Sequence, residues 1–215
     1  MFLFDMDGTL IDSNGIWKRV DREFLARRGL PYTHAYYEGV AHTIFPLAAK
    51  FTKEFCDLPE SCEEIMAEWM DLAQGLYANV TLKPGVRAYL RQCRSEGRQM
   101  ALVTSSVPEH CHTALHHLEL EKFFDRITFA QQLGLEKKEP DIWRAAAAAG
   151  GVRPEDCTIF DDSLAACKGA RAARMRVVGV YDDYFAQDET EMRGFCDVYI
   201  RSFEELLYTS RQRQR

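Results

Sequence analysis

The chain has 215 residues, of which 47% are apolar and 28% charged, and its formal net charge is −6. This composition can form a buried core, and it lacks the low hydrophobicity of a disordered chain. Basic residues are scattered apart from a cluster in the C-terminal RQRQR. Because nucleic-acid binding needs a basic stripe with aromatic residues between the charges, we expect no nucleic-acid partner.

Seven cysteines are present and none of them forms a C-x-x-C pair, which is typical of reduced, mostly buried thiols. The sequence shows no basic-then-apolar leader and no apolar run of about 18 residues or more. We therefore expect no secretion and no membrane span. The prediction is a cytoplasmic protein that is a monomer or a small homo-oligomer.

Short apolar runs recur along the chain, each followed by polar residues and most of them by a helical pattern. They occupy residues 2–4, 100–103, 126–129, 157–160 and 177–180. This alternation predicts an α/β fold with a Rossmann-like parallel sheet and helices on both of its faces. Ligands bind at the carboxyl ends of strands in such a sheet. The residues to inspect are therefore those just after three of these runs, namely Asp5 and Asp7, Thr104 and Ser105, and Asp161 and Asp162.

Residues 14–81 contain no convincing strand, and their pattern predicts helices over 16–28, 44–55 and 63–77. We expect Trp17, Phe24, Trp69 and Tyr77 in the core of this block and not in a substrate platform. The sequence Lys83-Pro84-Gly85 then marks the return to alternating strands and helices. We predict an all-helical domain over 14–81, inserted into an α/β core domain formed by 1–13 and 82–215.

The two acidic pairs are the main chemical signal. Asp5 and Asp7 stand at i and i+2 of an extended segment, so their side chains point to the same side. Asp161 and Asp162 follow another strand, whose end can be a neighbour of the first. Converging carboxylates repel one another unless a cation lies among them, and oxygen ligands suit Mg²⁺. Taken alone, either pair could instead cap a helix, as Asp161-Asp162-Ser163 could for the helix that begins at Leu164.

Four segments in order resemble the motifs of the haloacid dehalogenase-like hydrolase superfamily. They are Asp5-Met6-Asp7-Gly8-Thr9-Leu10, then Thr104 after the second run, then Lys137 before Pro140-Asp141-Ile142, and finally Phe160-Asp161-Asp162-Ser163. The helical block between the first two resembles the helical cap of the subgroup that includes phosphoglycolate phosphatase-like and β-phosphoglucomutase-like enzymes. The resemblance covers essentially the whole chain and implies a phosphatase acting on a small phosphate ester.

The resemblance also implies roles for individual residues. Asp5 would attack phosphorus and form an aspartyl-phosphate, and Asp7 would protonate the leaving oxygen and then activate water. Mg²⁺ would be bound by the Asp5 carboxylate, the Asp7 carbonyl and Asp162, with Asp161 as a direct or indirect ligand. Thr104, the backbone that follows it at Ser105, and Lys137 would bind the phosphoryl group.

The sequence departs from the family pattern at several positions. Ser105 stands where many relatives have asparagine, and Lys138 stands where proline is common, so that Lys138 stays an alternative to Lys137. Trp17 and His42 stand where the β-phosphoglucomutase pattern has histidine and arginine. These two departures favour a phosphatase over a phosphomutase, which stays the alternative function.

Two further hypotheses concern other residues. The segment 38–42 lies between predicted helices, and His42 is our candidate for a substrate contact from the cap. His112 and His116 stand at i and i+4 of a helix, which would suit zinc, although solvated histidines explain the pattern more simply. A catalytically inert binding protein on the same fold is the alternative from another functional class.

Overall fold

The computed structural model describes residues 1–40 and 45–207. Its contacts divide the chain into two compact units, Met1–Asn14 with Val80–Arg215, and Gly15–Asn79. We call the first the core unit and the second the helical unit. Within the described ranges, no helix combines the length and the apolar character needed to cross a membrane.

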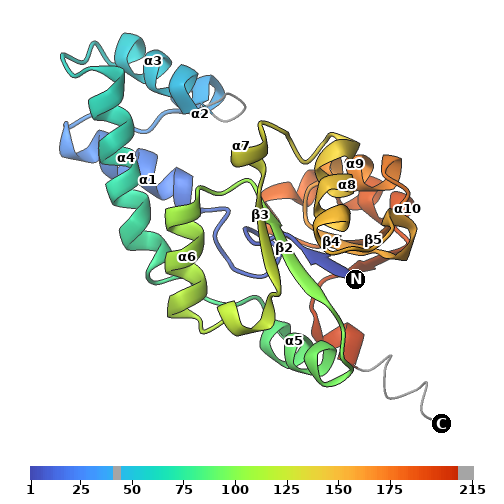
Figure 1. Ribbon diagram of the computed structural model, residues 1–215. Helices are drawn as coiled ribbons and strands as arrows, with labels where there is room; N and C mark the ends of the chain where they lie inside the picture. Colours follow the sequence, from blue (N-terminus) through green and yellow to red (C-terminus); the bar gives the residue numbers. More distant parts are fainter. Residues whose placement is uncertain (41–44, 208–215) are drawn as a thin grey trace. The chain divides into compact units, whose positions relative to one another are not determined.

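A six-stranded sheet forms the centre of the core unit, in the order β3-β2-β1-β4-β5-β6, and all of its strand pairs are parallel (Figure 1). The strands are β1 (Phe2–Phe4), β2 (Met100–Thr104), β3 (Arg126–Phe129), β4 (Thr158–Asp161), β5 (Arg176–Val180) and β6 (Val198–Ile200). In register, Phe4 of β1 lies between Leu102 of β2 and Phe160 of β4. The predicted α/β fold with a Rossmann-like parallel sheet is confirmed.

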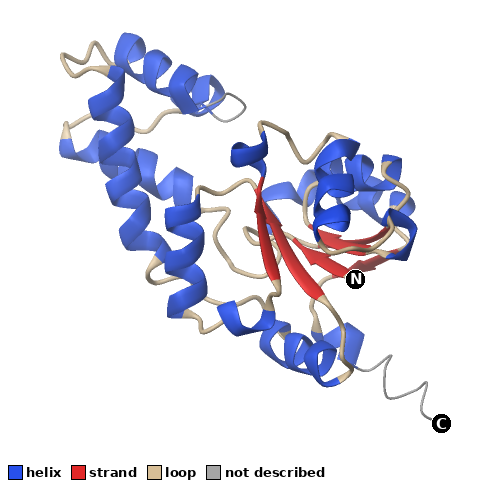
Figure 2. Cartoon of the chain, viewed as in Figure 1, coloured by secondary structure: helices blue, strands red, loops and turns tan. Residues whose placement is uncertain are grey.

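Helices connect these strands. They are α5 (Val86–Ser95), α6 (Pro108–His117), α7 (Ala130–Leu133), α8 (Pro140–Ala149), α9 (Leu164–Ala172) and α10 (Glu189–Phe195), with the short 3-10 helices η1 (Glu121–Phe123), η2 (Pro154–Asp156) and η3 (Asp183–Asp188). Figure 2 shows this alternation of strands and helices. Crossover helices of this kind are what parallel strands require.

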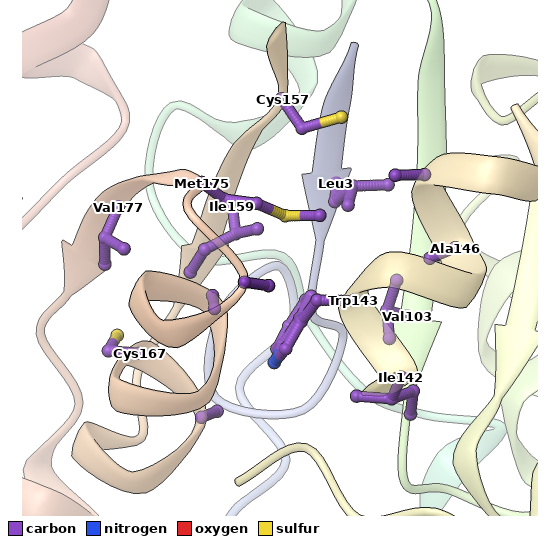
Figure 3. Close-up of a cluster of buried hydrophobic side chains, with 14 of the residues drawn as sticks. Leu3, Val103, Ile142, Trp143, Ala146, Cys157, Ile159, Cys167, Met175 and Val177 are labelled. Carbon is purple, nitrogen blue, oxygen red and sulfur yellow. The ribbon is translucent and has the colours of Figure 1, made fainter. Parts of the chain in front are cut away.

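Successive residues of each strand face opposite sides of the sheet, so the central strands bury both faces. On one face, Leu3 and Ile159 belong to an apolar cluster with Trp143 of α8, and the cluster extends to α9 and α10 (Figure 3). On the other face, Phe4 and Phe160 stack with their ring centroids 4.5 Å apart. Tyr89 of α5 packs against both of these rings. Helices thus cover both faces, as predicted.

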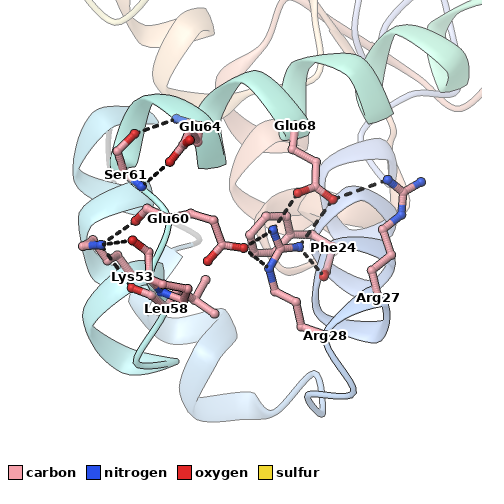
Figure 4. A network of polar contacts seen from close by, with 10 residues as sticks. Phe24, Arg27, Arg28, Lys53, Leu58, Glu60, Ser61, Glu64 and Glu68 are labelled. Carbon is pink, nitrogen blue, oxygen red and sulfur yellow. Dashed lines mark hydrogen bonds and ion pairs between the residues drawn. The ribbon is translucent and has the colours of Figure 1, made fainter.

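The helical unit consists of α1 (Ile16–Arg27), α2 (His34–Val40), α3 (Phe45–Phe55) and α4 (Cys62–Tyr77). Its core includes Phe24 and Trp69, whose rings meet edge to face at 5.7 Å. Ser61 and Glu64 form a reciprocal capping box at the start of α4 (Figure 4). Arg28 stacks on Phe24 and donates hydrogen bonds to Glu60 and Glu68, which joins the end of α1 to the segment before α4 and to α4 itself.

Three details differ from the sequence predictions. The three-residue strand β6 was not predicted. Residues 38–40 are not a loop but the end of α2, which is held by the buried Tyr36 and by a hydrogen bond from its backbone N–H to Thr33 Oγ1. Trp17, near the start of α1, is 37% exposed and therefore lies outside the buried helical core, and it packs edge to face on Phe45 of α3.

Candidate active site

Three neighbouring strands of the core unit bring the predicted site residues to one edge of the sheet. Asp5 follows β1, Thr104 ends β2, and Asp161 ends β4. Since β1 pairs with both β2 and β4 in parallel, these three carboxyl ends lie side by side. All three side chains are buried. The adjacency arises from the strand order, which places β1 between two strands that are distant in the sequence.

Asp5, Asp161 and Asp162 form a compact acidic cluster. One carboxylate oxygen from each lies within 4.8 Å of the other two. Asp5 Oδ1 accepts a hydrogen bond from Lys137, whereas Asp5 Oδ2 is buried and accepts none from any residue in the described ranges. A buried carboxylate oxygen without a donor is costly unless another group binds it.

Lys137 is the cation of this cluster. Its Nζ lies 2.5 Å from Asp5 Oδ1 and 3.0 Å from Asp161 Oδ2, and its side chain is 13% exposed. Lys138 points elsewhere: it pairs with Glu136, and its side chain is 63% exposed. The structure therefore brings Lys137 to the site and leaves Lys138 at the surface.

The loop that carries Lys137 is held by the hydrophobic core. The indole N–H of Trp143 donates a hydrogen bond of 2.8 Å to the Lys137 carbonyl, and Trp143 is itself fully buried in the cluster of Figure 3. On the other side, α9 approaches so closely that a Cβ on Gly169 would lie 2.4 Å from the same carbonyl oxygen. The position of Lys137 thus depends on how α8 and α9 pack.

The loop after β1 turns tightly at Gly8, whose φ of 80° favours glycine. Backbone N–H groups of Leu10 and Ile11 both donate to the Met6 carbonyl, which closes the turn. Asp7 lies on this loop, and its Oδ1 accepts a hydrogen bond of 2.6 Å from the buried Ser13 Oγ. Ser13 was not predicted as a site residue, although it lies six residues after Asp7 in the same loop.

The residues after β2 have different environments. Thr104 is fully buried, and its Oγ1 accepts a hydrogen bond of 3.0 Å from the Ser106 backbone N–H. Ser105 is exposed and belongs to the turn before α6. Of these two predicted phosphate-binding residues, Thr104 is fixed in the core next to β1, and Ser105 faces solvent.

Asp161 and Asp162 are held by different partners. Asp161 Oδ1 accepts from the Ser163 backbone N–H at 2.9 Å, and its Oδ2 accepts from Lys137. Asp162 accepts from Thr9 Oγ1 at 3.3 Å and from Asn14 Nδ2 at 2.6 Å. Ser163 also caps α9, because its side chain accepts a hydrogen bond from the Ala166 N–H. Ser163 therefore caps α9, while Asp161 and Asp162 belong to the acidic cluster.

The electrostatics of the cluster reflect charge that is buried and only partly neutralised. Burial raises the pKa of Asp161 to about 6, against the opposing effect of Lys137. Burial, with repulsion from Asp5 and Asp161, raises the pKa of Asp162 well above its usual range. Burial lowers the pKa of Lys137, but the Asp161 and Asp5 carboxylates outweigh it and raise that pKa overall. The site therefore favours an additional positive charge.

These residues fit a divalent cation. Three ionised carboxylates and one ammonium leave a formal charge of −2, and Asp5 Oδ2 offers lone pairs that no described residue uses. Carboxylate oxygens are the ligands preferred by Mg²⁺. Among the described residues, this cluster is the only group of three or more such side chains with metal-binding spacing.

Two of the remaining hypotheses rest on histidines. His42 lies outside the described residues. His112 and His116 are exposed on α6, and their Nδ1 atoms lie 3.9 Å and 4.0 Å from the carboxylate of Glu121. They belong to no metal-binding group of three or more in the described ranges, so the zinc hypothesis gains no support.

Lys83 and Asp182 are site residues that the sequence analysis missed. Asp182 is buried, accepts from the same Asn14 Nδ2 as Asp162, and lies two residues after the carboxyl end of β5. The rule that pointed to residues after the other strands would have found it. Lys83 carried no comparable signal, because Lys83-Pro84-Gly85 was interpreted only as the end of the helical block.

The chain is similar to known proteins over most of its length. The family model described as haloacid dehalogenase-like hydrolase matches residues 2–180. The chain is 27% identical over 180 residues to a phosphorylated carbohydrates phosphatase of Thermotoga maritima, covering 83% of each protein. It is 28% identical over 189 residues to hexitol phosphatase B of Escherichia coli, covering 83% of this chain and 82% of that protein.

A solved structure of similar fold is that of CbbY from Rhodobacter sphaeroides in complex with phosphate. It superposes with a TM-score of 0.79 and 23% sequence identity, covering 95% of each chain. At this level of identity the likeness concerns the fold.

Proposed function

This chain belongs to the haloacid dehalogenase-like hydrolase family and is a phosphoric monoester hydrolase. From this premise we propose that it is a Mg²⁺-dependent phosphatase of a small phosphorylated metabolite. The relatives named above act on phosphorylated carbohydrates and hexitol phosphates, which supports a substrate of that size and kind. The reaction would proceed through an aspartyl-phosphate on Asp5.

In the first half-reaction, a carboxylate oxygen of Asp5 attacks phosphorus and the bond from phosphorus to the ester oxygen breaks. Asp7 gives its proton to that leaving oxygen, so an alcohol departs. Lys137 and Thr104 bind the phosphoryl oxygens, which offsets the repulsion between two anions. The hydrogen bond from Ser13 to Asp7 supports this role, because it holds the Asp7 side chain in the loop that carries the nucleophile.

In the second half-reaction, water attacks the phosphorus of the aspartyl-phosphate. Asp7, now ionised, takes a proton from this water, and the bond between phosphorus and Asp5 breaks to release inorganic phosphate. Asp5 and Asp7 return to their starting states. Proton transfer of this kind typically contributes about 10²–10⁴-fold to the rate.

Asp5 and Asp162 would hold Mg²⁺, together with the backbone carbonyl of Asp7. When bound, the ion neutralises negative charge on the phosphoryl group and the nucleophile. Asp161, whose two oxygens accept from Ser163 and Lys137, would mainly hold Lys137 in place. The single observation that carries the proposal is the buried Asp5 Oδ2, which has no donor among the described residues, within the Asp5, Asp161 and Asp162 cluster.

Phosphate release from a panel of phosphorylated sugars, polyols and small acids, with and without Mg²⁺, tests this function. We expect Mg²⁺-dependent turnover that falls by at least about 10³-fold in Asp5→Asn, since the nucleophile is lost. The surface variant Asp141→Asn is the control and should keep wild-type turnover. An Asp5→Asn protein that is folded and fully active would refute the assignment.

The same panel separates the alternatives. A β-phosphoglucomutase-like enzyme would convert one sugar phosphate into its isomer with little net release of phosphate. A binding protein without catalysis would bind Mg²⁺ and turn over none of the panel.

A further inference from the structure

The side chain of Asn14 joins two buried carboxylates in the core unit. Its Nδ2 donates a hydrogen bond of 2.6 Å to Asp162 Oδ2 and another of 3.1 Å to Asp182 Oδ1. An amide nitrogen carries two hydrogens, so both are used. The opposite amide orientation would turn the Asn14 carbonyl toward two carboxylates, and the chemistry of the site excludes it.

Asp182 is in turn held by two donors besides Asn14. Its Oδ2 accepts from Lys83 Nζ at 2.6 Å, and its Oδ1 accepts from the Tyr184 backbone N–H at 2.9 Å. Asp182 forms an ion pair with Lys83, whose side chain is only 13% exposed. Asp182 can therefore accept from Asn14 without adding net negative charge to the neighbouring cluster.

Lys83 also fixes the loop of the nucleophile. Its Nζ donates to the Gly8 carbonyl at 2.9 Å and to the Tyr181 carbonyl at 2.7 Å. The Asn14 amide lies directly over Gly8, because a Cβ at Gly8 would fall 2.0 Å from Asn14 Nδ2 and 2.2 Å from Asp162 Oδ2. The loop after β1, the loop after β4 and the loop after β5 thus meet in one network of hydrogen bonds.

We propose that Asn14, held by the Lys83–Asp182 ion pair, is a positioning residue that sets the orientation of the Asp162 carboxylate for the divalent cation. The inference rests on the proposed function, since it takes Asp162 as a metal ligand. It adds Asn14, Lys83 and Asp182 to the residues that support the metal site, and none of the three belongs to the four sequence motifs.

The physical reason lies in the repulsion within the cluster. Asp162 is buried next to Asp5 and Asp161, and like charges drive such carboxylates apart. Thr9 and Asn14 donate to the two oxygens of Asp162 and fix its plane against this repulsion. Of these two hydrogen bonds the one from Asn14 is shorter, and it is the one supported by a further ion pair. Without it, the carboxylate would lose its preset orientation.

The test measures binding of Mn²⁺, as a spectroscopic substitute for Mg²⁺, to the full chain without substrate, by electron paramagnetic resonance. Asn14→Ala is expected to weaken Mn²⁺ binding about 10–100-fold, the range for groups that orient metal ligands. The double variant Lys83→Met/Asp182→Leu removes both charges of the ion pair and should also weaken Mn²⁺ binding. When the double variant is combined with Asn14→Ala, Mn²⁺ affinity should fall little further, because the ion pair acts through Asn14.

Arg171→Met is the matched control. Arg171 pairs with Asp197 at 3.0 Å in the core unit, and Asp197 also accepts from the Val177 backbone N–H, as Asp182 accepts from that of Tyr184. The Arg171–Asp197 pair is the more exposed of the two. Its loss should lower the melting temperature and leave Mn²⁺ affinity unchanged. In Asn14→Ala, turnover should recover at saturating Mg²⁺, since the reacting groups are intact.

The outcomes are distinct. Wild-type affinity for Mn²⁺ in a folded Asn14→Ala protein would overturn the positioning role. Fully additive losses in the combined variant would show that the ion pair does not act through Asn14, and would overturn that part of the inference. A wild-type chain that binds no Mn²⁺ would overturn the proposed metal site, and the positioning role with it.

Discussion

Two adjacent lysines show how strongly the environment of a side chain determines its role. Lys137 Nζ contacts two buried carboxylates, whereas Lys138 pairs with Glu136 at the surface. The two residues have the same chemistry and differ by one position. Of the two, only Lys137 is placed to neutralise Asp5 and, in the proposed mechanism, to bind the phosphoryl group.

Lys137→Met is therefore expected to reduce phosphate release by about 10²–10³-fold, the cost of losing one group that stabilises transition-state charge. Lys138→Met, one residue away, is the control and should keep turnover close to wild type. Steady-state kinetics of both variants measure the difference. A larger loss in Lys138→Met than in Lys137→Met would contradict the placement of the two side chains.

Asp21 in the helical unit is a second residue whose environment changes its pKa and, with it, the pH dependence of stability. Burial raises its pKa to about 7, against a weak hydrogen bond from Tyr36 Oη at 3.4 Å. Below about pH 4 both the folded and the unfolded states hold this proton. As the pH rises from about 4 to about 7, only the unfolded state ionises, so the contribution of Asp21 to stability falls.

Asp21→Asn should therefore raise the free energy of unfolding at pH 8 by roughly 1–2 kcal/mol. This is less than the free energy equivalent to the whole pKa shift, because the side chain is partly solvated. It should also flatten the loss of stability between pH 4 and pH 7. Denaturant unfolding at several pH values measures both effects, with Asp71→Asn at the surface of α4 as control. An unchanged pH slope would contradict the effect of burial.

At the scale of elements, the contact between α9 and the loop of Lys137 controls the site. Gly169 of α9 leaves no space for a Cβ, which would meet the Lys137 carbonyl oxygen at 2.4 Å and the Lys138 carbonyl carbon at 2.7 Å. Both are backbone atoms, so they can make room for a Cβ only if the whole loop moves. The absence of a side chain at Gly169 therefore sets how closely α9 approaches the loop of Lys137.

Gly169→Ala should displace this loop and lower turnover by about 10²-fold, the effect of a misplacement near 1 Å. It should also destabilise the protein by about 1–3 kcal/mol through overpacking. Gly194→Ala in α10 is the matched control, because a Cβ there meets no atom within 4 Å. It should stabilise the chain by about 0.5–1 kcal/mol at unchanged turnover. Equal activities of the two variants would refute the argument.

At the scale of the whole molecule, the acidic cluster connects stability to the cation. Three buried carboxylates from β1 and β4 repel one another in the folded chain, and the repulsion is weaker when the chain is unfolded. A cation that binds only the folded state stabilises it by mass action, by about 2.7 kcal/mol at 100 times its dissociation constant.

Mg²⁺ should therefore raise the melting temperature of the wild-type chain, and NaCl at matched ionic strength should not. Asp162→Asn should abolish the Mg²⁺ effect and melt at a higher temperature than the wild type without metal, because it removes a buried charge whose pKa is raised. Differential scanning calorimetry measures both. Equal Mg²⁺ stabilisation of the two proteins would contradict the assignment of Asp162.

Much of the fold could be predicted because it depends on local patterns. The runs at 2–4 and 126–129 became β1 and β3 at the same residues, and the helices of the middle block were placed within a residue or two. The short strand β6 and helix α2 were missed because their stability comes from packing. Tyr36 of α2, for example, is fully buried by the rest of the helical unit. The predicted function of the helical unit as a substrate-selecting cap remains a prediction.

The sequence by itself determined the α/β architecture and the candidate residues, since apolar periodicity and the positions of Asp5, Thr104, Lys137 and Asp162 can be read along the chain. Only the tertiary structure decided which neighbours complete the site. Asn14, Lys83 and Asp182 are separated by 168 residues at the widest, and they meet because β1, β4 and β5 are adjacent in the sheet. Hydrogen bonds between such distant residues depend on strand order, and no local pattern encodes them.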